Sequence, residues 1–153
     1  MHHGRTWIAL AATIFVGAAA IGQGTPAAAP PAADVIAGRQ AALRLSAATF
    51  GSMKGAIDRG DDVKSQASAA RALTSWARAL PGMFPAGSNG APTHALPTVW
   101  SDRAGFERAA AAYAAAADTL ATVAAAGDKP GFAAQWAVTR KTCGACHDSY
   151  RKE

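Results

Sequence analysis

Two cysteines and a histidine stand together near the C-terminus, in the run Cys143-Gly144-Ala145-Cys146-His147. Two thiols three positions apart lie near one face of a helical turn, so both can form thioethers to the two vinyl groups of one porphyrin. The next residue, His147, then lies under the iron and can serve as its proximal ligand. This C-x-x-C-H spacing is the attachment signature of a c-type haem. It predicts one covalent haem c per chain, bound through Cys143 and Cys146, with His147 as the metal ligand.

Three other kinds of site share part of this pattern. A thioredoxin-like redox pair needs a βαβ context, and the chain shows no strand-like alternation of apolar and polar residues. A zinc site needs four ligands, and only His94 would remain as a further cysteine or histidine after removal of a leader. A disulfide between the two cysteines can form in an oxidising compartment, but it gives the adjacent histidine no role. Haem attachment accounts for all three residues together.

The start of the chain has the pattern of an export signal. A basic residue, Arg5, is followed by a short apolar run and then by small residues, which is typical of a secretory signal peptide. A membrane anchor is the alternative, although the run is near the lower limit of ~17–25 residues for a spanning helix. We expect a signal peptide over residues 1–24 and a flexible lead-in, rich in proline and alanine, over residues 25–33. Export also agrees with the haem motif, because c-type haem is attached outside the cytoplasm. We therefore expect a periplasmic protein.

The length and net charge of the chain limit its domain count and the kinds of partner it can bind. The chain has 153 residues and a formal net charge of +5, from 15 basic and 10 acidic side chains. This length suits one domain after processing. The basic residues are scattered rather than clustered, so the charge gives no indication of a nucleic-acid partner.

Four amphipathic stretches separated by turn signals occupy residues 34–59, 61–80, 101–126 and 128 onward. In the first stretch, apolar residues recur at steps of three, four or seven, which makes one stripe along a helix. Alanine fills half of the third stretch, which favours helix and permits close helix approach. The last stretch places Phe132, Trp136 and Thr139 on the same side as the two cysteines. The pattern predicts an all-α, antiparallel four-helix bundle over residues 34–153, with the haem attached covalently to its last helix.

Capping and turn residues mark the ends of these helices. Asp34 and Ser101 are expected as the N-caps of the first and third helices, and Gly60 and Gly127 as their C-terminal stops. The segment 81–99 carries four prolines and three glycines and is the one long loop. A loop of this length in a compact domain is more often functional than idle.

A haem on the last helix of such a bundle faces the core, so its other face should meet the first helix. That helix offers Leu43, whose alkyl side chain cannot bind iron, with Arg39 one turn before it. Met53 is ten residues further on, about 15 Å along the helix axis, and is expected in the core instead. Met83, His94 and the lysines are the other candidates for a sixth ligand.

Five short motifs, in order along residues 34–152, resemble those of the cytochromes c′. They are Arg39-Gln40-x-x-Leu43, Phe50-Gly51-x-Met53, Leu80-Pro81-x-x-Phe84, Pro97-x-x-Trp100-Ser101-Asp102 and Cys143-x-x-Cys146-His147-Asp148-x-Tyr150-Arg151-Lys152. The last motif alone indicates only a c-type haem. The ordered combination on four helices is much more specific.

The resemblance implies a periplasmic, often dimeric four-helix bundle with a five-coordinate, high-spin haem. In this resemblance His147 matches the proximal ligand, and Leu43 matches the apolar distal residue of the five-coordinate members. Arg39 and Gln40 match residues near the haem propionates, and Arg151 matches a basic residue beside the proximal histidine. Arg39 could instead solvate the first helix, and Arg151 could be a charge on a fraying end.

Three hypotheses about function follow from these residues. An open coordination site behind Leu43 favours NO and CO over O₂, because bound O₂ gains from a distal hydrogen-bond donor. We therefore expect a haem protein, not an enzyme, that binds NO and CO, or transfers single electrons to an unidentified redox partner, or does both. The resemblance implies that it is a homodimer. A peroxidase or NO reductase would need a distal acid–base group, which the first helix does not supply near Leu43. A low-spin, six-coordinate electron carrier would need one of the sixth ligands named above.

Overall fold

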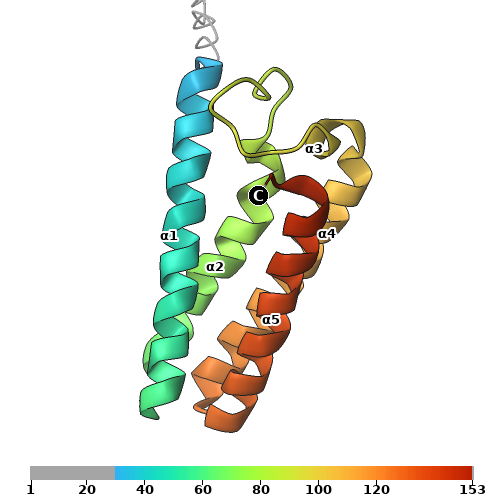
Figure 1. Ribbon diagram of the computed structural model, residues 1–153. Coiled ribbons are helices and arrows are strands. Elements are labelled where there is room, and N and C mark those ends of the chain that lie inside the picture. Colours follow the sequence, from blue (N-terminus) through green and yellow to red (C-terminus); the bar gives the residue numbers. More distant parts are fainter. Residues whose placement is uncertain (1–29, 153) are drawn as a thin grey trace, which may run out of the picture.

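The computed structural model describes residues 30–152, which form an antiparallel bundle of four long helices (Figure 1). The long helices are α1 (Ala32–Arg59), α2 (Ala67–Ala79), α4 (Arg103–Ala126) and α5 (Lys129–Tyr150). Shorter helical turns lie between them: η1 (Val63–Gln66), η2 (Leu80–Met83) and α3 (Thr98–Ser101). The predicted all-α four-helix bundle is therefore confirmed. The expected signal peptide, and the expected lead-in up to residue 29, lie outside the described residues.

The first helix begins earlier than the sequence pattern predicted. Pro31 occupies the N-cap position of α1 without a side-chain hydrogen bond, so the prediction that Asp34 caps the helix is wrong. The helix starts at Ala32 because Pro31 already has a suitable φ of −54° and the alanines that follow favour helix. Asp34 lies in the first turn, where its negative charge suits the helix dipole. Gly60 ends α1 as predicted, in the left-handed conformation with φ 69°.

The N-cap of α4 is Asp102, and the prediction of Ser101 is wrong. A single helical turn, α3, follows Pro97 and takes up Ser101, so the cap falls one residue later. One carboxylate oxygen of Asp102 accepts from the Gly105 amide at 3.1 Å, and the other accepts from the Tyr150 hydroxyl at 2.8 Å. These two bonds, the hydroxyl first, lower the pKa of the Asp102 carboxyl. The start of α4 is thereby joined to the end of α5.

The central helix of the bundle is α4, which packs most extensively against α2 and α5. Alanines on α4 make this close approach feasible, because a methyl group keeps neighbouring backbones near each other. Its length and its mean hydropathy of 1.3 would also suit a membrane span, but α2 and α5 cover it on two sides. By contrast, α1 makes far fewer contacts with α2 and α5.

Buried apolar side chains form two separate clusters. The lower core surrounds Leu73, Leu120 and Phe132 near the α1–α2 turn, and it includes the fully buried Met53. The upper core lies nearer the other end of the bundle and consists of Leu80, Phe84, Val99, Phe106 and Ala110. The space between α1 and α5 opens beside the upper core.

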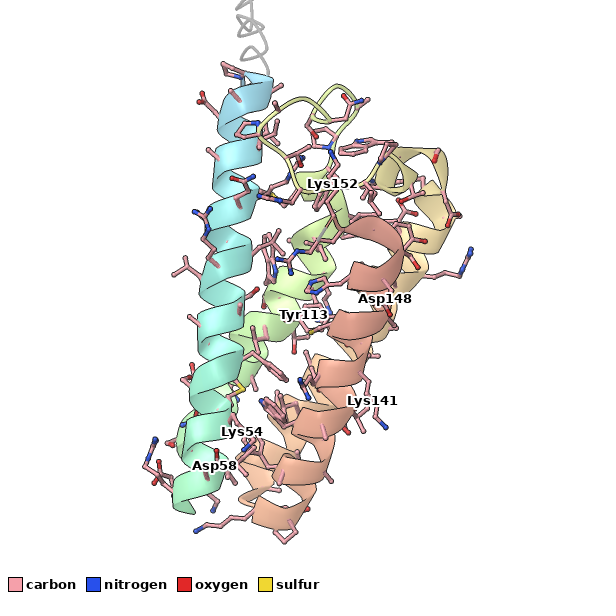
Figure 2. All side chains as sticks on the ribbon, in the orientation of Figure 1. Lys54, Asp58, Tyr113, Lys141, Asp148 and Lys152 are labelled. Atoms are coloured by element: carbon pink, nitrogen blue, oxygen red, sulfur yellow. The ribbon has the colours of Figure 1, made fainter. Side chains whose placement is uncertain are left out.

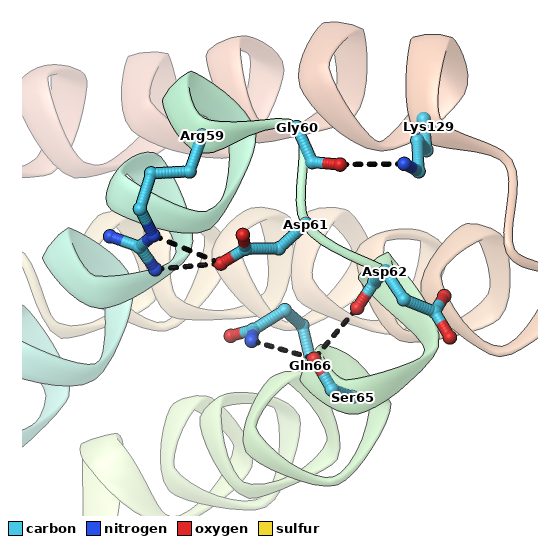
Figure 3. Close-up of polar contacts among 7 residues, drawn as sticks. All are labelled: Arg59, Gly60, Asp61, Asp62, Ser65, Gln66 and Lys129. Carbon is cyan, nitrogen blue, oxygen red and sulfur yellow. Dashed lines mark hydrogen bonds and ion pairs between the residues drawn. The ribbon is translucent and has the colours of Figure 1, made fainter.

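Polar contacts stabilise the lower end of the bundle. Arg59 pairs with Asp61 across the turn after α1, with nitrogen and oxygen 2.7 Å apart (Figure 3). Lys129, at the start of α5, donates to the Gly60 carbonyl at 2.6 Å. The Lys129 bond holds the end of α1 against the start of α5, so the gap between the two helices lies toward their other ends.

Replacing Gly105 by alanine should destabilise the protein. The new Cβ would collide with the Asp102 carboxylate and the Tyr150 hydroxyl. Both groups can swing aside, but the cap and the tie to α5 are then lost. We expect the free energy of unfolding to fall by about 1–2 kcal/mol, although alanine is the better helix former. Urea unfolding followed by circular dichroism measures this difference.

Gly38→Ala on α1 is the matched control, because nothing lies within 4 Å of its added Cβ. It should leave stability unchanged or raise it by up to about 1 kcal/mol. A Gly105→Ala protein as stable as wild type would contradict the described role of the Asp102 cap.

Candidate functional site

A cavity of about 490 Å³ lies between α1 and α5, with α2, α4 and the loop before α3 completing its wall. This volume is within the ~300–1,000 Å³ typical of small-molecule and cofactor sites. All seven residues that the sequence pointed to line it: Arg39, Gln40, Leu43, Cys143, Cys146, His147 and Arg151. The fold therefore brings the C-terminal motif of α5 and the first half of α1 to one place.

The two cysteines lie half-buried in the wall that α5 contributes, and both are free thiols. Burial raises the pKa of each thiol, so both carry their protons at neutral pH. His147 follows on the same helix. Burial, and then the nearby Arg151, lower the pKa of its imidazole. The neutral imidazole is the form that binds a metal.

Arg151 ends α5 and stays next to His147. Its backbone amide donates to the His147 carbonyl at 3.1 Å, and its guanidinium lies 3.4 Å from the imidazole Nδ1. The loop before α3 also pairs with this end of the chain, through an isolated antiparallel bridge between Ala95 and Arg151. The last turn of α5 is thus held by contacts from outside the helix.

The wall opposite the cysteines is the upper half of α1. Leu43 is half-buried, lines the cavity and packs against the upper core. Leu45, two positions later, is 69% exposed on the other side of the helix. Gln40 lines the cavity as well, and its side-chain amide donates to the Pro92 carbonyl at 2.5 Å.

Arg39 is the most deeply buried charged residue of the site, with 1% of its surface exposed. The resemblance implied a propionate partner for it, but the described residues already give it several acceptors. Its two terminal nitrogens donate to the Ser88 hydroxyl and carbonyl, the Thr93 hydroxyl and the Met83 carbonyl, at 2.7–3.4 Å. Burial lowers the pKa of the guanidinium, which is nevertheless far too basic to lose its charge at neutral pH. Only Nε is left for a partner in the cavity.

Aromatic side chains that the sequence analysis did not assign to the site close the lower end of the cavity. The Phe50 and Trp136 rings stack with centroids 4.7 Å apart, and the Trp136 indole donates to the Phe50 carbonyl at 3.0 Å. Tyr113 lies beside them in the space between α1 and α5 (Figure 2). A sequence signal existed: Phe50 follows Leu43, and Trp136 precedes Cys143, by seven residues, or two helical turns.

The candidates for a sixth iron ligand differ in whether they line the cavity. Met53 is fully buried in the lower core, as expected, and does not line the cavity. Met83 contributes its carbonyl to Arg39 but no part of the cavity wall, and no lysine of residues 30–152 reaches the wall either. His94 does line the cavity, from the loop before α3.

The chemistry of the lining suits a flat, largely apolar group that carries carboxylates. Most of the wall is apolar or aromatic, and it includes two half-buried free thiols, a group able to form thioethers. Four arginines line the cavity, Arg39, Arg44, Arg140 and Arg151, whereas its lining includes no carboxylate from residues 30–152. These properties match a c-type haem with its two propionates.

Comparisons with known proteins agree with this chemistry. The sequence model of the family described as cytochrome C′ matches residues 34–151. The cytochrome c′ of Rubrivivax gelatinosus is 34% identical over 123 residues, which cover 78% of this chain and 95% of that protein. A nitric oxide complex of a leucine-to-alanine mutant of cytochrome c prime from Alcaligenes xylosoxidans has a TM-score of 0.75 at 28% identity, over 82% of this chain and 99% of that one. A carbon monoxide-bound leucine-to-glycine variant from the same organism has a TM-score of 0.74 at 29% identity, over 80% and 98%.

Tyr113 should make the protein sensitive to alkali. Burial in the cavity wall, and then the neighbouring Cys143, raise the pKa of its hydroxyl well above the usual value of about 10. The folded protein then holds a proton that the unfolded chain releases. This contribution to stability is complete below about pH 10 and is lost as the pH rises toward the folded-state value. Melting temperatures from pH 8 to 11.5 should therefore fall more steeply for wild type than for Tyr113→Phe. Parallel curves for the two proteins would contradict the role of this hydroxyl.

Proposed function

This chain belongs to the cytochrome c′ family, and from that membership we propose that it is a periplasmic haem protein that binds NO and CO and transfers single electrons. The family carries covalent haem c, and so does this chain. When bound, the haem supplies an iron that exchanges one electron and offers a coordination site to a diatomic gas. The following paragraphs state what the residues of the chain contribute.

In this proposal Cys143 and Cys146 hold the haem through two thioethers, and His147 is its iron ligand. The half-buried position of both thiols in the cavity wall supports the attachment. The lowered pKa of His147 keeps the imidazole neutral and ready to coordinate. Arg151, 3.4 Å from the imidazole, stays beside the ligand on the proximal side.

Leu43 faces the same cavity from α1 and is the observation that carries the proposal. Its side chain neither coordinates iron nor donates a hydrogen bond. Water and anions lose hydrogen bonds in such surroundings, whereas NO and CO depend on them little. We therefore assign a five-coordinate iron whose free side is covered by Leu43 and is selective for NO and CO over O₂.

The same wall argues against an enzyme such as a peroxidase. Acid–base catalysis needs a side chain that gives and takes a proton near the reacting group. The part of α1 that lines the cavity contributes neither carboxylate nor imidazole, and its charged residues are Arg39 and Arg44. We propose that the chain acts by binding and electron transfer alone.

Two further parts of the proposal concern location and assembly. The expected signal peptide over residues 1–24 and the haem chemistry both support export to the periplasm. A homodimer is supported by the outer face of α1, where Ala37, Ala41 and Leu45 are exposed in a row at four-residue steps. The redox partner is unidentified.

His94 supports one alternative, a low-spin electron carrier with two histidine ligands. It lies on the loop that lines the cavity, which distinguishes it from Met53 and Met83. The proposal gives His94 no role at the iron.

The absorption spectrum of the ferric protein, expressed with its haem, tests the proposal. We expect the bands of a high-spin, five-coordinate iron, together with changes on adding NO and CO to the reduced protein. His94→Ala should leave the ferric spectrum unchanged. A sharp low-spin spectrum that becomes high-spin in His94→Ala would establish the alternative instead, and a colourless protein would contradict haem binding.

Leu43→Ala should speed the capture of CO. An incoming ligand has to displace the Leu43 side chain, and each 1.4 kcal/mol of barrier removed corresponds to about a tenfold faster rate. Since a packed leucine contributes about 2–5 kcal/mol, we expect the association rate to rise at least about tenfold. Stopped-flow mixing of CO with the ferrous protein measures it.

Leu45→Ala is the matched control, because this leucine lies on the same helix but is 69% exposed. Its rate should equal that of wild type. Equal rates in wild type and Leu43→Ala would show that Leu43 does not cover the gas site.

A further inference from the structure

The loop over residues 84–97, which we call the strap, joins two parts of the site that lie on different helices. Figure 1 shows it between the N-terminal end of α1 and the C-terminal end of α5. The strap is not a free loop: Ser88 is buried, with 1% of its surface exposed, and Thr93 and Ala95 line the cavity. Its contacts with α1 and with α5 determine whether a change at one helix reaches the other.

On the α1 side, the strap is folded around Arg39. Three of its groups accept from the guanidinium: the Ser88 hydroxyl at 2.8 Å, the Ser88 carbonyl at 2.7 Å and the Thr93 hydroxyl at 2.7 Å. The guanidinium carbon also lies 4.4 Å from the centre of the Phe84 ring, in cation–π geometry. A buried guanidinium that makes this many bonds fixes its acceptors in space, because losing any one leaves a buried donor unpaired.

On the α5 side, the strap is paired with the residues that follow His147. The Leu96 amide donates to the Tyr150 carbonyl at 3.0 Å, and the Lys152 amide donates to the His94 carbonyl at 2.8 Å. The Thr98 hydroxyl, just after the strap, donates to the Ser149 carbonyl at 2.7 Å. These bonds hold the last turn of α5 from outside.

A short route connects the two sides. The Thr93 hydroxyl that accepts from Arg39 also accepts from the Ala95 amide at 3.1 Å. Ala95 is in turn paired with Arg151 in the isolated bridge. Three consecutive contacts therefore lead from the Arg39 side chain on α1 to Arg151, the residue beside the proposed iron ligand.

We propose that Arg39 is a positioning residue: through the strap it fixes the last turn of α5 and so the position of His147, on the proximal side of the haem. Arg39 does this although it lies on α1, the helix that faces the distal side. The inference rests on the proposed role of His147 as iron ligand. A guanidinium is needed because its planar fork serves several acceptors at fixed angles, whereas a lysine ammonium is a single point charge. The charge itself is not what the strap requires.

Two variants of the haem-loaded protein separate this role from a bond to a propionate. Arg39→Lys keeps the positive charge and removes the planar guanidinium that serves several acceptors. Ser88→Ala/Thr93→Val keeps Arg39 and removes two of its acceptors in the strap. Arg71→Lys, at an exposed position of α2, is the control. The first measurement is backbone hydrogen exchange of peptides that cover residues 90–98 and 146–152. The second is the iron–histidine stretching band of the ferrous protein in the resonance Raman spectrum.

In both Arg39→Lys and Ser88→Ala/Thr93→Val, we expect hydrogen exchange to be at least tenfold faster in both peptides and the iron–histidine band to shift. We expect neither change in Arg71→Lys. Wild-type exchange of peptide 146–152 in Arg39→Lys would overturn the proposal. So would a band that shifts in Arg39→Lys but not in Ser88→Ala/Thr93→Val, because Arg39 would then act on the haem directly. Should a combined variant not fold, the single Thr93→Val substitution gives the same comparison. If the wild-type protein lacks the iron–histidine band, the role of His147 fails, while hydrogen exchange still decides whether the strap couples the two helices.

Discussion

The separation of α1 from α5 is the constraint on which the rest of this molecule depends. Alanines let α2, α4 and α5 pack closely, but α1 makes few contacts with α5 and the cavity lies between them. Two structures keep α1 apart from α5: the stacked rings of Phe50 and Trp136 below, and the strap above. The resulting 490 Å³ cavity is lined mainly by apolar groups. A large apolar cofactor such as haem would pack against these groups, and this contact would provide its binding energy.

Arg39 illustrates how the several donors of one buried guanidinium can organise a loop that has little regular structure. Four prolines and three glycines in residues 81–99 leave few backbone hydrogen bonds of the usual kind. The guanidinium replaces them, because it collects carbonyl and hydroxyl acceptors from three separate positions of the loop region. Arg103 does the same from α4, donating to the carbonyls of Pro81 and Phe84. Two arginines on different helices thus give the segment a defined course.

Local sequence signals predicted the helices well, whereas long-range partners could not be read from them. Periodic apolar residues and the left-handed glycines Gly60 and Gly127 marked the long helices, and C-x-x-C-H marked the attachment site. The cap of α4 was missed by one residue, because the turn of α3 depends on how the loop meets α5. The acceptors of Arg39 are 44–54 residues away along the chain, and no spacing rule links them. The resemblance indicated that Arg39 belongs to the site without indicating what it binds there.

The division of the apolar interior into two clusters has a consequence for biogenesis. Phe50 and Trp136 close the lower core, so that half is complete with amino acids alone. All five residues of the upper core line the cavity, whereas none of the buried residues of the lower core does. The halves are therefore unequal cooperative units, and the upper one opens more readily. We therefore expect the lower half to fold first, and the turns of α5 that carry Cys143 and Cys146, which line the cavity, to become ordered later.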